Sequence, residues 1–462
     1  MCYSLDDTIV AVATPPGVGA LGIVRLSGNE AFKIASKVLQ KPSGGFYSVG
    51  SLPSHTVHYA FLVDPVGGER IDEVLFALFK APKSYTSQDM VEVTCHGGPV
   101  VLERALEAFV VAGARLARPG EFTLRAFLLG RLDLAQAEAV ADLIESASEE
   151  GRRAALAQLE GGLSRKMGKL AQALREVLGE LEAAIDFPDE GVELGNHLAE
   201  RVDGVVREIE GLMATYREGK LCREGVRVAI VGLPNVGKSS LFNALVGEDR
   251  AIVTSQPGTT RDVVEAQVAW GGVLFRFMDT AGFRESGDEA EGEGVKRARK
   301  CMEEGDLVLV VLDRSCPLQE GDRVLVREVS GRGVVVVNKI DLPGAWSQED
   351  LGRVMVGRPT FHVSAKRGDG LESLKKALIE MVGRGRRREG EIPLVTNVRH
   401  YQALIGAKDA LLRSLKAWQE GLSAEFVAAD VKGALEALGE ITGETTPEDV
   451  LDAIFSRFCI GK

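Results

Sequence analysis

Cysteine and long apolar runs are both scarce in this chain of 462 residues. Its six cysteines form no CxxC pair and no zinc-type spacing, so neither a disulfide scaffold nor a structural zinc site is expected. The longest apolar run, near 307–312, falls far below the roughly 18 residues that a membrane-spanning helix needs. Asp6 and Asp7 precede the first apolar stretch, which is the wrong charge for a secretory signal. We therefore expect a soluble, cytoplasmic protein with no membrane segment.

Positive charge is also in deficit. The chain has 55 Lys and Arg against 67 Asp and Glu, a net charge of −12. This argues against a general nucleic-acid coat, because non-specific affinity comes from neutralised phosphates. Two thirds of the net charge falls within residues 121–220, whereas 1–120 and 221–380 are nearly neutral and arginines cluster at 384–388. The charge therefore predicts a poor unaided RNA binder but does not exclude an RNA substrate.

Changes of pattern along the chain predict three domains, the number that about 150 residues per domain also suggests. Short β-branched runs between Gly and Pro turns in residues 1–119 indicate an α+β domain. Apolar residues recur every three or four positions over 156–185, as in one long amphipathic helix. Strand-like runs at 226–231, 307–312 and 334–337 alternate with helical patterns, which indicates a parallel, doubly wound sheet.

The predicted fold class is therefore α/β plus all-α, with one domain inserted into another. Helical sequence stands on both sides of the α/β segment. We expect a helical domain in two parts, 120–222 and 384–462, interrupted by an inserted α/β domain at 223–383. An α+β domain at 1–119 precedes them.

The strongest motif is Gly232-Leu233-Pro234-Asn235-Val236-Gly237-Lys238-Ser239, which follows a predicted strand and opens a predicted helix. Gly232 and Gly237 allow backbone N–H groups to face phosphates, and the helix N-terminus adds a favourable dipole. Lys238 would reach the β- and γ-phosphates, and Ser239 would hold Mg²⁺. A chance glycine-rich turn is the alternative, which the strand–loop–helix context disfavours. The predicted nucleotide contacts in this loop are Asn235, Val236, Gly237, Lys238, Ser239 and Ser240.

A second phosphate element, Asp279-Thr280-Ala281-Gly282, ends a predicted strand. Asp279 can hold the Mg²⁺ shell and Gly282 can sense the γ-phosphate, with Thr280 between them as a further nucleotide contact. Ras-like enzymes place a Gln directly after this element to orient the attacking water, but this chain has Phe283 there. Another group must therefore position the water.

Two further loops predict guanine as the base. Asn338-Lys339-Ile340-Asp341 follows a predicted strand, and the Asp341 carboxylate can accept two N–H groups of guanine, whereas adenine presents the wrong pattern. Ser364-Ala365-Lys366 completes the base loop after the next apolar run. Each motif is weak alone, but their order and their positions at strand ends predict GTP rather than ATP.

Further motifs along the whole chain point to one family. They include Asn235 in the phosphate loop, Gly258-Thr259-Thr260-Arg261-Asp262 and the chain end Phe458-Cys459-Ile460-Gly461-Lys462. Others lie at 7–11, 13–17, 96–99, 118–122, 132–139 and 186–190. Together these motifs resemble the MnmE (TrmE) family of tRNA-modification GTPases.

The resemblance implies a complete reaction. Members of this family act with a flavoprotein partner, MnmG, to install a carboxymethylaminomethyl or aminomethyl group on C5 of the wobble uridine of certain tRNAs. A folate one-carbon donor, 5-formyl-tetrahydrofolate or methylene-tetrahydrofolate, and GTP hydrolysis are implied. So are a Ras-like P-loop domain at 223–383, a homodimer formed through a folate-binding domain at 1–119, and a heterotetramer with MnmG. The nitrogen source, glycine or ammonium, and the tRNAs recognised stay open.

The resemblance also implies a cation site. The family's G domains dimerise across their nucleotide faces when K⁺ takes the place of an arginine finger and offsets phosphate charge. Thr260 matches the switch threonine that closes on Mg²⁺, so the implied Mg²⁺ ligands are Ser239, Thr260 and Asp279. The implied K⁺ ligands are the Asn235 side chain and the backbone carbonyls of Thr254, Gln256 and Thr259; Thr254 and Thr259 are also implied nucleotide contacts.

The family's water-orienting acid matches Glu291. Members usually follow this residue with Arg and an aliphatic residue, whereas this chain has Gly292 and Glu293. Glu291 and Glu293 are therefore both candidates for orienting water, and a solvated acidic loop is the alternative for either.

For folate, the resemblance implies Arg25, Glu92, Arg131 and Lys462. Their cationic groups suit a glutamyl tail, and a carboxylate suits the amino edge of a pterin. Arg131 stands where the family often has Lys, so the charge is kept and the donor geometry differs. Without the resemblance, each of these residues would be taken for an ordinary surface charge.

Cys459 is the remaining chemical candidate. Beside Arg457 and Lys462, its thiol could be activated by neighbouring cations and act as a nucleophile or an acid. The alternative is a small buried hydrophobe between Phe458 and Ile460.

Two other classes of function fit parts of the sequence. A regulatory or ribosome-assembly GTPase would need an RNA-binding module, such as a GxxG loop in a basic context, but the sequence after the α/β domain is acidic helix. A standalone folate-dependent transferase with GTP as an allosteric input is compatible with residues 1–119 alone. How closure of the G domains would reach the folate pocket stays open.

Overall fold

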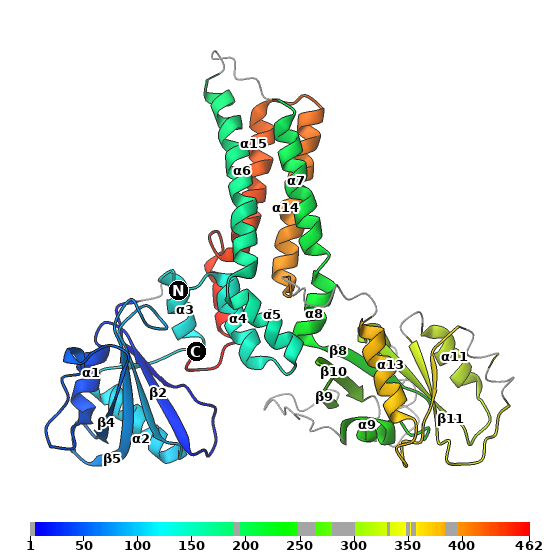
Figure 1. The fold of residues 1–462 in the computed structure, drawn as a ribbon, viewed down its shortest axis with the longest axis horizontal. Helices are drawn as coiled ribbons and strands as arrows, with labels where there is room; N and C mark the ends of the chain where they lie inside the picture. Colours follow the sequence, from blue (N-terminus) through cyan, green and yellow to red (C-terminus); the bar gives the residue numbers. More distant parts are fainter. Residues whose placement is uncertain are drawn as a thin grey trace. The chain divides into compact units, whose positions relative to one another are not determined.

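Two units make up the fold of this chain (Figure 1). The first contains residues 1–141, 158–210 and 402–462, and the second contains 142–157 and 211–401. The second unit therefore takes in residues 211–222, which the sequence pattern groups with the helical domain. The computed structural model describes residues 5–187, 195–247, 264–279, 301–329, 333–347, 352, 357–383 and 395–462.

A seven-stranded sheet forms the N-terminal part of the first unit, in the order β3-β4-β5-β6-β2-β1-β7. All its pairings are antiparallel except that of β1 with β7. Side chains alternate between the two faces, and one set, including Val24, Phe76 and Val93, forms a core with α1 and α2. The elements are β1 (Ile9–Val12), β2 (Leu21–Ser27), α1 (Ala31–Val38), β3 (Leu39–Gln40), η1 (Val49–Ser51), β4 (Thr56–Val63), β5 (Arg70–Phe79), β6 (Met90–His96), α2 (Pro99–Ala112) and β7 (Arg115–Leu116).

The opposite face of this sheet exposes apolar side chains. Leu21 and Val57 are each 65% exposed. Tyr59 and Leu75, which pair across β4 and β5, are exposed as well. An antiparallel sheet commonly has one core face and one solvated, polar face, so this apolar content needs a reason.

A bundle of helices forms the rest of the first unit. The helix predicted over 156–185 is interrupted, because Gly161 adopts a left-handed φ of 78° and separates α5 from α6. The predicted apolar stripe of α6, from Leu163 to Leu181, is buried, and α6 packs along α15 (Figure 1). The helices are α3 (Glu121–Leu128), α4 (Leu134–Glu145), α6 (Gly162–Asp186), α7 (His197–Met213), α14 (Val398–Gln419), α15 (Ala424–Thr442) and α16 (Glu448–Phe455), whereas most of α5 (Glu149–Leu159) belongs to the second unit.

A six-stranded sheet forms the second unit, in the order β13-β12-β11-β8-β10-β9. Five strands are parallel, as predicted, but β9 is antiparallel to β10, to which a turn at Gly271 and Gly272 connects it. Both faces of the sheet pack into cores, as a doubly wound fold requires. The elements are α8 (Tyr216–Glu224), β8 (Val226–Val231), α9 (Lys238–Gly247), β9 (Val264–Trp270), β10 (Val273–Asp279), β11 (Leu307–Asp313), α11 (Glu320–Glu328), β12 (Gly333–Asn338), β13 (Thr360–His362) and α13 (Leu371–Gly383).

The chain thus combines an N-terminal α+β domain, a helical bundle and a P-loop α/β domain, which confirms the predicted fold class. In the part of the chain that the structure describes, no helix is both long enough and apolar enough to cross a membrane.

Candidate functional sites

The phosphate loop connects the end of β8 to the start of α9. Gly237 has a left-handed φ of 96°, and a Cβ there would collide with the amide of Asn338. The Lys238 ammonium reaches back over the loop and donates to the carbonyls of Gly232 (3.0 Å) and Leu233 (2.8 Å). The loop therefore combines a cation with a helix N-terminus, and this is the chemistry that an anionic phosphate requires.

Asn338 ties the base loop to the phosphate loop. Asn338 is 2% exposed. Its side chain donates a hydrogen bond to the Val236 carbonyl (3.0 Å) and accepts one from the Ala365 N–H (3.1 Å). The Asp341 carboxylate accepts a hydrogen bond from the Ser364 hydroxyl (2.7 Å), which holds the pKa of Asp341 below its ordinary value. An ionised carboxylate only accepts hydrogen bonds, as recognition of two guanine N–H groups requires.

Among the other predicted nucleotide and metal residues, Ser239, Ser240 and Lys366 lie in or next to these loops in sequence. Ser239 and Ser240 occupy the first turn of α9, Lys366 is exposed, and Asp279 ends β10, where its register partner on β8 is Ile230. The side chain of Asp279 is outside the described residues, as are Thr254, Gln256, Thr259, Thr260, Thr280, Gly282 and Glu291. Within the described ranges, no group of three or more His, Cys, Asp or Glu could hold a metal ion.

The four residues predicted for folate, Arg25, Glu92, Arg131 and Lys462, are called here the four-residue cluster. Arg25 on β2 and Glu92 on β6 are cross-strand partners, joined from Nε to Oε1 at 2.8 Å. Arg25 Nη1 also donates to the Gly461 carbonyl at the end of the chain (3.1 Å). Burial lowers the pKa of the Lys462 ammonium, and the Arg25 charge lowers it further, whereas Glu92 opposes the shift. Residues from both ends of the chain thus share one site.

Tyr85 contacts both arginines of this cluster, and sequence patterns do not identify it. Its ring centroid is 5.4 Å from the guanidinium carbon of Arg25 and 5.0 Å from that of Arg131. Arg131 Nη1 also donates to the Tyr85 carbonyl (2.7 Å), and the Tyr85 and Thr123 hydroxyls lie 2.8 Å apart. Burial raises the pKa of Tyr85, so its hydroxyl is neutral at ordinary pH. A single aromatic residue in a loop belongs to no periodic sequence pattern, so only the folded structure shows which residues it contacts.

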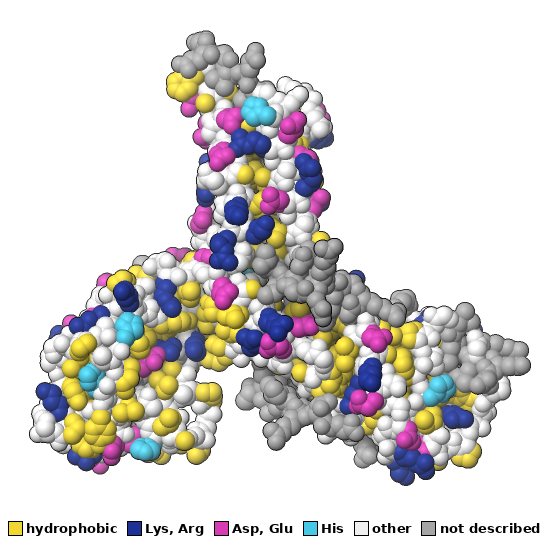
Figure 2. Space-filling view, viewed as in Figure 1, with side chains coloured by type: hydrophobic (Ala, Val, Ile, Leu, Met, Phe, Trp, Pro, Cys, Tyr) yellow, Lys and Arg dark blue, Asp and Glu magenta, His cyan; other side chains and the backbone are white. Residues whose placement is uncertain are grey.

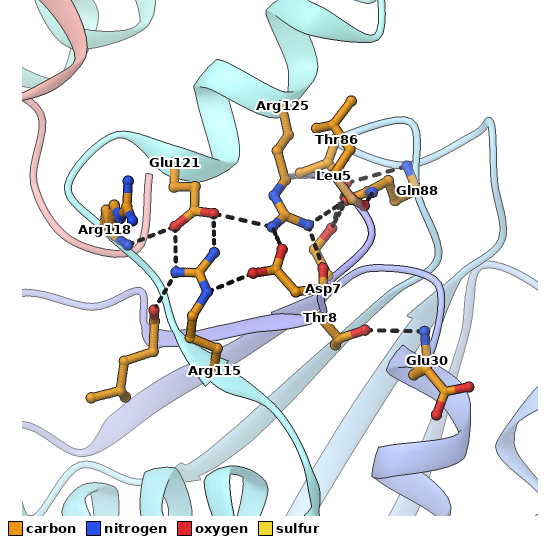
Figure 3. Close-up of polar contacts among 12 residues, drawn as sticks. Leu5, Asp7, Thr8, Glu30, Thr86, Gln88, Arg115, Arg118, Glu121 and Arg125 are labelled. Carbon is orange, nitrogen blue, oxygen red and sulfur yellow. Dashed lines mark hydrogen bonds and ion pairs between the residues drawn. The ribbon is translucent and has the colours of Figure 1, made fainter. Parts of the chain in front are cut away.

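A partly buried ionic network joins the segment before β1, strand β7 and helix α3 (Figure 3). Arg125, only 1% exposed, donates to Asp7 Oδ1 (2.6 Å) and to Glu121 Oε1 (3.0 Å). Arg115 pairs with the same two carboxylates, at 2.6 Å each. Burial alone would raise the pKa values of Asp7 and Glu121, but the bonds from the arginines outweigh it and lower both. Arg125 also reaches Gln88, three positions after Tyr85 (3.1 Å).

Helix α3 also anchors the end of the chain. The N–H groups of Gly120 and Phe122 donate to the carbonyls of Cys459 (3.5 Å) and Lys462 (3.2 Å). Gly461, with a φ of 96°, approaches β1 so closely that a Cβ there would collide with its backbone. The chain end is therefore docked on the N-terminal domain. Cys459 is exposed there, so the alternative of a buried small hydrophobe is wrong.

Known proteins are similar to this chain over its whole length. A family model described as the GTP-binding protein TrmE N-terminus matches residues 8–131, and one described as the MnmE helical domain matches 134–459. The tRNA modification GTPase MnmE of Moorella thermoacetica is 46% identical over 463 residues, covering 99% of this chain and 100% of that protein. The protein of the same name from Heliobacterium modesticaldum is 47% identical over 467 residues, with the same coverage. Among solved structures, the G domain of the T. maritima FeoB iron transporter is 31% identical, with a TM-score of 0.27; the match covers 34% of this chain and 97% of that one.

Proposed function

This chain belongs to the MnmE family of tRNA modification GTPases, and we propose that it installs a carboxymethylaminomethyl or aminomethyl group at C5 of the tRNA wobble uridine. It is a GTP hydrolase that acts in tRNA modification. In the proposed reaction it works in the cytoplasm as a homodimer, joined by the flavoprotein MnmG in a heterotetramer. The observation that carries the proposal is the convergence of the four-residue cluster from four distant segments of the chain.

The four-residue cluster fits a folate. Two guanidinium groups and an ammonium suit the carboxylates of a glutamyl tail, and Glu92 suits the amino edge of a pterin. The partly buried Tyr85 ring lies within 5.4 Å of the guanidinium carbons of both Arg25 and Arg131. When bound, 5-formyl- or methylene-tetrahydrofolate supplies the one-carbon unit. Cys459, exposed and three residues from Lys462, is the proposed catalytic thiol, acting as a nucleophile or an acid.

The proposed GTP site is the edge of the second sheet where the phosphate and base loops meet. The link from Asn338 to Val236 and the ionised Asp341 support it. We assign Mg²⁺ to Ser239, Thr260 and Asp279, whose oxygens are the ligands that this ion prefers. The proposed nucleotide contacts are Asn235, Val236, Gly237, Lys238, Ser239, Ser240, Thr254, Thr259, Thr260, Asp279, Thr280, Gly282, Asn338, Lys339, Asp341, Ser364, Ala365 and Lys366.

Hydrolysis is proposed to depend on K⁺, bound by the Asn235 side chain and the carbonyls of Thr254, Gln256 and Thr259. Asn235 holds a left-handed φ of 64° within the phosphate loop, a conformation that Asn tolerates better than most residues. Hydrolysis should therefore be slow in NaCl and about tenfold or more faster in KCl at equal ionic strength. Equal rates in both salts would contradict the K⁺ site.

Glu291 is the proposed group that orients the attacking water. Phe283 cannot take this role, because its ring has no hydrogen-bonding atom. Glu291→Ala should lower turnover while leaving GTP affinity nearly unchanged, and Glu293→Ala serves as its matched control. A loss of turnover in the Glu293 variant alone would transfer the role to that residue.

The exposed apolar face of the N-terminal sheet supports the proposed homodimer. Leu21, Val57, Tyr59 and Leu75 all project from this face. Figure 2 shows hydrophobic side chains gathered on the N-terminal domain. Contiguous apolar patches on a protein surface mark interaction sites. A second copy of the domain, which carries the same patch, would remove these side chains from water.

Mass analysis of tRNA nucleosides tests the whole proposal. Cells that lack this protein should lose the modified wobble uridine, and the wild-type chain should restore it. Cys459→Ser should hydrolyse GTP at the wild-type rate but fail to restore the modification, whereas Cys222→Ser, a half-exposed thiol elsewhere in the chain, should restore it. Modified uridine that persists in the deletion strain would refute the proposed function.

A further inference from the structure

Asp313 ends strand β11, next to the base loop, and belongs to no motif identified above. Its register partner on β12 is Asn338, and its side chain is 10% exposed. The N–H and hydroxyl of Ser315 donate to Asp313 Oδ1 at 2.8 and 2.6 Å. These two bonds orient the carboxylate, and its other oxygen, Oδ2, lies 2.6 Å from the Lys339 ammonium.

Lys339 joins two loops that are otherwise distant in sequence. Its ammonium donates to Asp313 and also to the carbonyl of Asn235 in the phosphate loop (2.8 Å). Lys339 and Asn235 both have left-handed backbones, with φ values of 61° and 64°. Such conformations strain residues other than glycine and persist only where the surroundings hold them. The contact through the ammonium is therefore one of the forces that keep both loops in shape.

The carboxylate is what keeps the ammonium in this place. A hydrogen bond to one backbone carbonyl holds the long, flexible side chain of Lys339 only weakly. The largely buried carboxylate of Asp313, at 2.6 Å, adds a stronger, charge-assisted bond. Burial alone would raise the pKa of Asp313, but the bonds from Lys339 and Ser315 outweigh it and lower the pKa, so the group is ionised at neutral pH.

We propose that Asp313 is a positioning residue for nucleotide binding, which acts through Lys339 to lock the base loop onto the phosphate loop before the nucleotide arrives. The inference rests on the nucleotide site proposed above. A nucleotide with phosphates at Lys238 and guanine at Asp341 must lie along both loops, so their spacing sets its affinity. Pre-organised loops lose less entropy when the nucleotide binds. Loss of this pre-organisation should therefore weaken nucleotide affinity more than it slows the chemical step.

The test measures binding of a fluorescent GDP analogue and steady-state hydrolysis at saturating K⁺. Asp313→Asn keeps the shape of the side chain and an acceptor for Ser315 but removes the charge. It should weaken GDP binding and raise the KM for GTP about tenfold, while kcat changes by less than about twofold. The matched control is Asp306→Asn, which removes a carboxylate from the other end of β11, where it pairs with Arg227, and should leave both constants unchanged.

A double-mutant cycle with Lys339→Gln shows whether Asp313 acts through Lys339. If it does, Asp313→Asn should cause no further loss of affinity in the Lys339→Gln background. Additive losses, or a wild-type affinity for Asp313→Asn, would overturn the inference. Lys238→Ala separates the inference from its premise, because a wild-type GDP affinity in that variant would show that the nucleotide site itself is misassigned, and the inference would fall with it.

Discussion

The nucleotide site and the four-residue cluster differ in how far apart their parts lie along the chain. The phosphate loop places its cation, its glycines and its helix N-terminus within residues 232–239. In the cluster, Arg25 bonds to Glu92 on another strand and to Gly461, which is 436 positions away. A site within one loop depends on local backbone geometry, whereas a site built from distant segments depends on everything that holds those segments together. Changes far from both sites should therefore harm the cluster more.

Lys238→Ala should have the largest effect on activity, and it should affect the nucleotide site without affecting the four-residue cluster. It removes the ammonium that lies over the phosphate loop, so GTP hydrolysis should fall about a hundredfold or more. The affinity for 5-formyl-tetrahydrofolate, measured by titration calorimetry, should change less than about twofold, since the two sites belong to different units and share no residue. Lys220→Ala, on α8, should alter neither quantity. A parallel loss of folate binding would break the comparison and show that the sites depend on each other.

Arg125→Met tests the claim that distant contacts hold the cluster together. The change leaves the largely buried Glu121 and the partly exposed Asp7 with Arg115 as their remaining charged partner, so the free energy of unfolding should fall by about 1–3 kcal/mol in denaturant titrations. Folate binding should weaken with it, because α3 anchors the chain end. GDP affinity should persist. Arg104→Met, an exposed arginine on α2, should change stability little. An equal loss of GDP affinity would contradict the contrast between the sites.

Tyr85→Leu removes a ring that contacts two members of the cluster. Without the ring, Arg25 and Arg131 lose a common support, and the affinity for 5-formyl-tetrahydrofolate should fall about fivefold to tenfold. Tyr85→Phe keeps the ring and loses only the contact with Thr123, so its affinity should stay within about threefold of wild type. Equal affinities for the two variants would mean that the contact of the ring with the two arginines does not contribute to folate binding.

The smallest effect concerns the pH dependence of folate binding. Because its pKa is lowered, the Lys462 ammonium loses its proton below the ordinary lysine value of 10.5. Its attraction for carboxylates is present at neutral pH and is lost as the pH rises through the lowered pKa. Lys462→Arg stays charged, so its affinity for 5-formyl-tetrahydrofolate should hold where the wild-type affinity declines by a few fold. Identical affinity profiles between pH 7 and 10 would exclude this role for Lys462.

The lowered pKa of Lys462 affects folding stability in the direction opposite to its effect on ligand binding. The unfolded chain binds the Lys462 proton more tightly than the folded chain does, so burial of the charged ammonium opposes folding at neutral pH. This penalty disappears as the pH rises through the lowered pKa toward 10.5. The charge of Lys462 therefore favours binding of the proposed ligand but lowers the stability of the folded chain at neutral pH.

Two differences between pattern and structure have a local cause that the sequence contains. The helix predicted over 156–185 breaks at Gly161, where a second glycine follows and a left-handed residue is easily accommodated. The expected parallel sheet gains an antiparallel strand, β9, because Gly271 and Gly272 form a two-residue hairpin turn between Trp270 and Val273. Over 156–185 the apolar periodicity was continuous, and in both cases the glycines carried the decisive information.

The network of Asp7, Arg115, Glu121 and Arg125 has no such signal. Its four side chains come from the start of the chain, from β7 and from α3, and their pairing depends on the docking of α3 against the N-terminal sheet. Charged residues of this kind are normally taken for surface groups. The burial of Glu121 and Arg125, and the position of Tyr85, could not be predicted from spacing.

The sequence by itself determined the chemistry of the nucleotide site, because one strand end, one loop and one helix start place Gly232, Gly237 and Lys238 within a few residues of each other. Only the tertiary structure decided which charges gather around Tyr85. Arg25 meets Glu92 through the register of β2 with β6, and the chain end reaches them through its backbone bonds to α3. Register and docking follow from the packing of whole cores, which no short pattern encodes.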